Sequence, residues 1–173
     1  MDGNDFSFIT PAPFRKNIIE SVEFTAWLWV AAKGIEKRFV DDINRTIILY
    51  NISIIEALLL FRVRKLKIKF MTQEYKKAHE LPIQFRKANQ SVVVAFRENI
   101  TKADSQIWLN DLLREQQNFL GDKLHQQIKT LQDARNTLHL SKKRSERFTL
   151  QKSQASFDAL LAVVTKMKKE IKD

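Results

Sequence analysis

The feature that most constrains the fold is the apolar run from Ile47 to Phe61. A helix drawn through it is apolar on nearly every side, so other elements must cover it along its length. A membrane-spanning helix needs about 20 apolar residues, which is more than this run contains. A glutamate inside a span is also costly. Because Glu56 interrupts the run, the sequence predicts the core helix of a soluble bundle and no membrane association.

The scarcity of helix breakers extends this prediction to the whole chain. Only three glycines and three prolines occur among 173 residues, and 44% of the residues are hydrophobic. Such a composition favours long helices over a sandwich or a barrel. We therefore expect an all-α protein, an up-down bundle of about four to five helices. It should form one domain over residues 14–173, after a flexible leader at residues 1–13.

Periodicity and capping signals place the expected helices. One should run from Phe14 to about Phe39, with Gly34 ending or bending it. The core helix should start at Asp41 or Asp42, whose carboxylates suit the positive end of a helix dipole, and end at Lys65. The other helices are expected over residues 101 or 104 to about 117, from Gly121 through the motif described below, and over residues 150–171.

Residues 71–100 have a less regular pattern. A short helix is expected at residues 75–80, and Pro82 should stop it. The apolar stretches 83–85 and 92–94 flank a polar segment at residues 88–91. This arrangement predicts a small irregular hairpin insert.

Charge and cysteine content bound the partners and the compartment. The formal net charge is +10, which favours polyanionic partners, nucleic acid first. The chain has no cysteine, which fits a reducing cytoplasm and excludes thiolate chemistry. Its three histidines have no metal-ligand spacing, and no glycine-rich phosphate loop occurs. We therefore expect a cytoplasmic protein with neither a metal site nor a cofactor.

One stretch of the chain looks like a chemical site rather than scaffold. Leu124, Ile128, Leu131, Arg135 and Leu138 recur at helical spacing and form one stripe. Arg135 is then a cation on an apolar face, where a charge is costly unless it is paired. His139 lies one turn further along. Glu56 of the core helix is either the carboxylate partner of a buried Arg135 or an ordinary surface carboxylate.

An arginine and a histidine one helical turn apart have the chemistry for cleaving RNA without a metal ion. Attack of a 2′-hydroxyl on the adjacent phosphate needs a proton acceptor and a proton donor, and the ordinary pKa of histidine lies near neutrality. The reaction also needs a fixed cation on the phosphorane, which a guanidinium supplies. Such pairs also arise by chance in basic helices, so the spacing alone leaves an ordinary ion pair open.

The motif Arg135-Asn-Thr-Leu-His139 resembles the arginine–polar–x–x–histidine signature of the HEPN superfamily, which comprises all-helical ribonuclease and nucleotide-binding domains. The core helix over residues 47–60, with Glu56, is also similar to that family. So are the string Trp108-Leu-Asn-Asp-Leu and the start of the last helix at Phe148. The resemblance covers about residues 40–173, although three residues separate Arg135 from His139, fewer than the family usually has.

The resemblance implies a metal-independent endoribonuclease of toxin, defence or stress-response type. It implies His139 as the general acid and base and Arg135 as the phosphate stabiliser, with Asn136 and Glu56 orienting them. It also implies a homodimer with facing motif helices, and a nucleotidyltransferase-like antitoxin as a possible regulator. The basic segment after the motif would hold the RNA backbone through Lys142, Lys143, Arg144 and Arg147.

Two other functions remain open. The same fold could be a non-catalytic RNA- or nucleotide-binding module. The chain could also be a structural helical bundle, in which Arg135 is only part of an ion pair and its loss mainly destabilises the fold.

Overall fold

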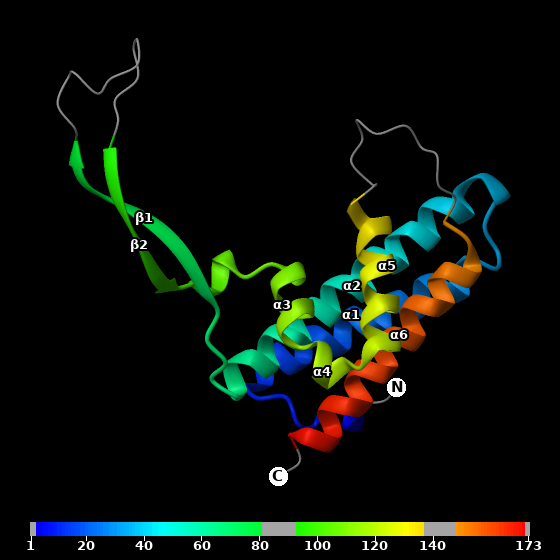
Figure 1. Cartoon of the computed structure of the whole chain (residues 1–173). Coiled ribbons are helices and arrows are strands. Elements are labelled where there is room, and N and C mark those ends of the chain that lie inside the picture. Colours follow the sequence, from blue (N-terminus) through cyan, green and yellow to red (C-terminus); the bar gives the residue numbers. More distant parts are fainter. Residues whose placement is uncertain (1–2, 81–92, 137–147, 172–173) are drawn as a thin grey trace.

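The computed structural model describes residues 3–80, 93–136 and 148–171. These residues form a mainly helical protein with a small two-stranded antiparallel sheet (Figure 1), which confirms that the protein is mainly α-helical. In chain order the elements are η1 (Gly3–Phe6), α1 (Ala12–Ala31), α2 (Lys37–Lys65), β1 (Met71–Glu80), β2 (Val93–Thr101), η3 (Asp104–Gln106), α3 (Leu109–Glu115), α4 (Gln117–Leu120), α5 (Asp122–Asn136) and α6 (Leu150–Glu170).

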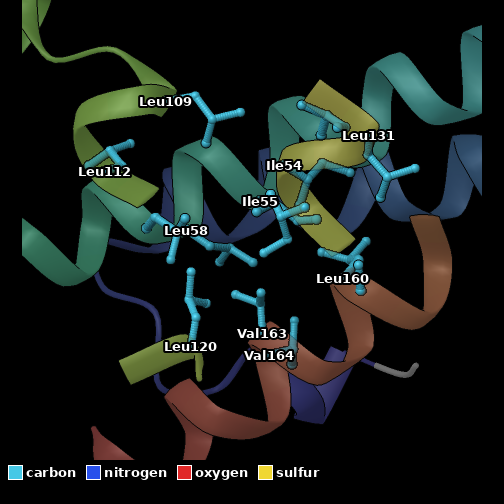
Figure 2. Packing of buried hydrophobic residues seen from close by; sticks show 14 of the residues in the cluster. Ile54, Ile55, Leu58, Leu109, Leu112, Leu120, Leu131, Leu160, Val163 and Val164 are labelled. Carbon is cyan, nitrogen blue, oxygen red and sulfur yellow. The ribbon is translucent and has the colours of Figure 1, made fainter. Parts of the chain in front are cut away.

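Helix α2 is the centre of the core, as its apolar run predicts. It packs against α1, α5 and α6, and its isoleucine and leucine side chains meet those of α3, α5 and α6 (Figure 2). Several of these α2 side chains have no exposed area, namely Ile47, Ile48, Ile52, Ile55, Leu58 and Leu59. Within the described part of the chain α2 is the one helix long and apolar enough to span a membrane, but 61% of its most apolar window is buried inside the protein.

The boundary between the first two helices differs from the prediction. Helix α1 ends at Ala31, and α2 begins at Lys37, so Gly34 lies in the break between them. The expected capping role of Asp41 is wrong, because α2 has already made its first turn there. The Asp41 carboxylate instead accepts a hydrogen bond from the backbone N–H of Phe148, at 2.6 Å. Asp41 therefore ties α2 to the segment just before α6 rather than capping the start of α2.

The first residues are packed onto the bundle, in contrast to the expected flexible leader. Phe6 is 1% exposed and Ile9 is fully buried, and both belong to the hydrophobic core. The ammonium of Lys168 in α6 also lies 2.9 Å from the carboxylate of Asp5. Two large apolar side chains so close to the N-terminus are enough to anchor it.

Strands β1 and β2 form an antiparallel pair that projects away from the helices (Figure 1). Met71 pairs with Thr101 at its base and Glu80 with Val93 at the far end, with an irregularity between Lys77 and His79. The expected helix at residues 75–80 is therefore wrong. Pairing with a second strand rich in valine and phenylalanine outweighs a weak local helix preference. The expected strand at residues 83–85 lies outside the described residues.

The hairpin also shortens the third helix. The expected start at Thr101 or Asp104 is wrong, because Thr101 ends β2 and α3 begins only at Leu109. Asp104 belongs instead to the short helix η3 and pairs with Arg64 at 2.8 Å. This connection determines where Trp108 lies, as described below.

A buried arginine joins the far end of α2 to α4 and α6. Arg62 is 8% exposed, and its guanidinium donates to both carboxylate oxygens of Glu170, at 2.5 and 2.6 Å. It also donates to the side-chain oxygen of Gln116 at 3.1 Å and lies 4.0 Å from the ring centre of Phe119. Arg62 is therefore a structural residue of the bundle.

Candidate functional site

The expected contact between the core helix and the motif helix is present. Nη1 of Arg135 donates a hydrogen bond to Oε2 of Glu56 at 2.9 Å. Glu56 lies in α2, and Arg135 lies in the last described turn of α5. Of the two interpretations of Glu56, the structure supports the partner of Arg135.

The pair is more open than the apolar stripe suggests. The stripe itself is confirmed at Leu124, Ile128 and Leu131, which are all buried. Arg135, however, keeps 37% of its side-chain area exposed, and Glu56 keeps 27%. The expectation that Arg135 is buried is therefore wrong. One nitrogen of its guanidinium is bound to Glu56, and the group is still accessible to a ligand.

The ion pair forms part of the wall of a cleft of about 510 Å³ between α2, α3 and α5. Its lining is mostly polar and includes carboxamide groups as well as the ion pair. The lining residues are Leu49, Glu56, Trp108, Leu109, Asn110, Gln132, Arg135 and Asn136. Asn136, the last described residue of α5, therefore lies in the same cleft as Arg135, as the sequence predicts.

Gln132 is a polar group in the wall of this cleft with an unmet hydrogen-bonding requirement. Gln132 is 7% exposed, and its buried Oε1 atom accepts no hydrogen bond from the described residues. An unsatisfied buried acceptor costs about 1–3 kcal/mol.

The entry to α3 is held by a carboxylate. One oxygen of Asp111 accepts hydrogen bonds from the backbone N–H of Trp108 at 3.1 Å and from the ammonium of Lys102 at 2.9 Å. Burial of Asp111 raises its pKa, but these two hydrogen bonds and the charges of Lys102 and Arg114 outweigh burial, so the pKa lies below its ordinary value of 3.8. Asp111 is thus a charged anchor that fixes the backbone of Trp108.

The other predicted site residues lie outside the described residues. They are the histidine of the motif and the basic segment that follows it, namely His139, Lys142, Lys143, Arg144 and Arg147. On one side of them, Asn136 is the last described residue of α5 and lines the cleft. On the other side, Phe148 is held by Asp41 and by Asn44, whose amide donates to its carbonyl at 3.0 Å.

Sequence reasoning missed the part of the cleft that α3 contributes. The expected third helix, over residues 101 or 104 to about 117, includes Trp108, but Trp108 precedes α3 and is 68% exposed. Asn110 and Gln132 carried no signal, because an isolated amide side chain is ordinary in a helix. The acidic residue three positions after Trp108 was the available sign that a helix starts there.

Among the described residues no group of three or more histidine, aspartate or glutamate side chains could hold a metal ion. Comparison of the chain with family models, with curated proteins and with solved structures found no match. The function of the chain is therefore inferred from the residues of the cleft and from the motif in the sequence.

Proposed function

We propose that this cleft is the active site of a metal-independent endoribonuclease of the HEPN type. The observation that carries the proposal is the Arg135 guanidinium, which is fixed by Glu56 at 2.9 Å and yet open to a cleft lined by amides. Among the described residues Glu56 is its one hydrogen-bond acceptor. Its remaining N–H donors can therefore bind the oxygens of a phosphate, which match the guanidinium in geometry and charge.

The proposed reaction assigns each group one task. The 2′-hydroxyl oxygen forms a bond to the adjacent phosphorus, and the bond from phosphorus to the 5′-oxygen breaks. His139 takes the proton of the 2′-hydroxyl, and the imidazolium so formed gives that proton to the leaving 5′-oxygen. Arg135 stabilises the charge on the pentacoordinate phosphorus, and the products are a 2′,3′-cyclic phosphate and a 5′-hydroxyl.

His139 enters the proposal through the sequence and through chain connectivity. It follows Asn136, a residue that lines the cleft, by three residues in the sequence. Glu56 and Asn136 are proposed to orient the arginine and the histidine, and Lys142, Lys143, Arg144 and Arg147 to bind the RNA backbone.

The same resemblance supplies the setting of the proposal. A cytoplasmic toxin or defence enzyme would act on RNA as a homodimer, with a nucleotidyltransferase-like antitoxin as its regulator. The net charge of +10 supports a polyanionic substrate. A non-catalytic RNA-binding module of the same fold is the alternative, since the amides of the cleft suit binding without chemistry.

The test uses purified full-length chain and RNA in the presence of EDTA. Wild-type protein should release fragments that end in a 2′,3′-cyclic phosphate. His139→Ala should slow cleavage about 100- to 10,000-fold, and Arg135→Ala about 100- to 1,000-fold. His125→Ala and Arg38→Ala are matched controls, because both residues lie outside the lining of the cleft and Arg38 is 71% exposed, and both should cleave like wild type.

The outcomes separate the candidate functions. Equal cleavage by wild type and both site variants would reveal a contaminating nuclease and remove the proposal. Binding of RNA that weakens steeply with salt, without any cyclic phosphate product, would favour the binding module. If the protein neither binds nor cleaves RNA, the structural helical bundle is the candidate that remains.

A further inference from the structure

Trp108 occupies a position that neither helix formation nor core packing explains. It is the N-cap residue of α3, where serine, threonine, aspartate or asparagine is favoured. Its side chain is 68% exposed, and among the described residues it has no aromatic or cationic stacking partner. A large exposed indole at a cleft is typical of a contact with a ligand.

The backbone that carries the indole is held by hydrogen bonds and by packing. Asp111 fixes the backbone N–H of Trp108, and the next residue, Leu109, is 2% exposed in the core. Lys102 ties the same carboxylate to the end of the hairpin. The backbone that carries the tryptophan is therefore ordered before any ligand binds, which lowers the entropic cost of binding.

We propose that Trp108 is the stacking platform for an unpaired base, so that the substrate at this cleft is single-stranded RNA. This inference rests on the proposed function and names its substrate class. A base lying on the indole would place its neighbouring phosphate toward Arg135, which lines the same cleft. The carboxamides of Asn110 and Asn136 can both donate to and accept from the edge of a base.

The chemistry of the cleft favours a single strand over a duplex. Bases inside a duplex are covered on both faces by their neighbours, so only an unpaired base can present a face to a tryptophan. A volume of about 510 Å³ suits one or two nucleotides rather than a helix of paired strands. Stacking tolerates every base, because each one has a π-face, so sequence preference would come from the amides.

The experiment measures binding with strands that cannot be cleaved. Each strand is a 2′-O-methyl RNA of about 12 nucleotides, which lacks the attacking hydroxyl and matches the site sizes of single-strand binders. One strand carries a fluorescent 2-aminopurine, whose emission falls when it stacks, one carries an abasic residue at that position, and one is annealed to its complement. Full-length protein is titrated against each, and dissociation constants are read from fluorescence anisotropy.

The expected result is specific to the indole. Trp108→Ala should weaken binding of the single strand about 5- to 100-fold, and Trp108→Phe much less, because loss of one stacked base has an effect of that size. The abasic strand should bind wild type more weakly than the intact strand, and Trp108→Ala should no longer distinguish the two. Trp27→Ala is the matched control, because Trp27 is 63% exposed and does not line the cleft.

The two proposals fail in different ways. If Trp108→Ala binds the intact strand as wild type does, or if wild type prefers the duplex, the stacking proposal is overturned, whatever the enzyme does to ordinary RNA. If binding depends on Trp108 but ordinary RNA is never cleaved, the stacking proposal stands and the nuclease proposal is lost. If wild type binds no strand, both are overturned.

Discussion

The two arginine–glutamate pairs of this protein should respond very differently to the same substitution. Arg62 is 8% exposed and makes three hydrogen bonds, two to Glu170 and one to Gln116. Arg135 keeps 37% of its side-chain area exposed and, within the described residues, makes one hydrogen bond, to Glu56. Replacing each arginine with alanine therefore compares a buried structural pair with an open one.

The magnitudes follow from what each substitution leaves behind. In Arg62→Ala the carboxylate of Glu170 regains water, because it is already 35% exposed, but the side-chain oxygen of Gln116, at 1% exposure, stays buried without its donor. We expect a loss of about 3 kcal/mol, the low end for breaking a buried pair. In Arg135→Ala the carboxylate of Glu56 faces the cleft, so the loss should be about 1 kcal/mol.

Equilibrium unfolding in urea, followed by circular dichroism, measures both losses of unfolding free energy, and thermal unfolding measures the changes in Tm. For a chain of this size each kcal/mol lowers Tm by about 2–4 °C, so Tm should fall about 6–12 °C for Arg62→Ala and about 2–4 °C for Arg135→Ala. If Arg135→Ala lost as much stability as Arg62→Ala, the Glu56–Arg135 pair would be a structural element. The functional interpretation of the cleft would then lose its main support.

Three further predictions follow from other contacts. Phe6→Ala should lower the free energy of unfolding by about 3–5 kcal/mol, because Phe6 is 1% exposed in the core; a change below about 1 kcal/mol in urea titrations would mean that the N-terminal segment contributes little. Glu56→Gln should slow RNA cleavage about 10- to 100-fold by loosening Arg135, while the free energy of unfolding changes by less than about 1 kcal/mol; unchanged cleavage would refute the orienting role. Asp111→Asn should remove stability that exists only while Asp111 is ionised. Because the pKa of Asp111 is lowered on folding, the difference in unfolding free energy between wild type and Asp111→Asn should be constant from about pH 5 to 7 and shrink below about pH 4. A difference that persists unchanged at acidic pH would contradict the anchoring role of the charge.

The core and the ion pair could be predicted from the sequence because both depend on helical periodicity. An apolar run without gaps requires cover on all sides, which fixes α2 at the centre of the bundle. A charge on an apolar stripe requires a partner, and Glu56 was the conspicuous carboxylate in the helix most certain to be buried. These inferences use contacts that every stable helix pair must satisfy, so no knowledge of the connections was needed.

The hairpin could not be predicted in the same way. Residues 75–80 carry side chains compatible with a helix, and their strand conformation depends on partners about 20 residues away. A sequence pattern records local preference but not pairing between distant segments. The errors at residues 75–80 and at Thr101 therefore share one cause. Residues 75–80 pair with β2, and Thr101 belongs to β2.

The same insertion explains why the α3 side of the cleft was missed. Because β2 runs to Thr101 and η3 follows it, α3 starts at Leu109 and leaves Trp108 ahead of the helix instead of on its buried face. Lys102, at the end of the hairpin, and Asp111, in the first turn of α3, then fix the tryptophan at the cleft through one carboxylate. The base of the hairpin therefore helps to place Trp108 at the cleft.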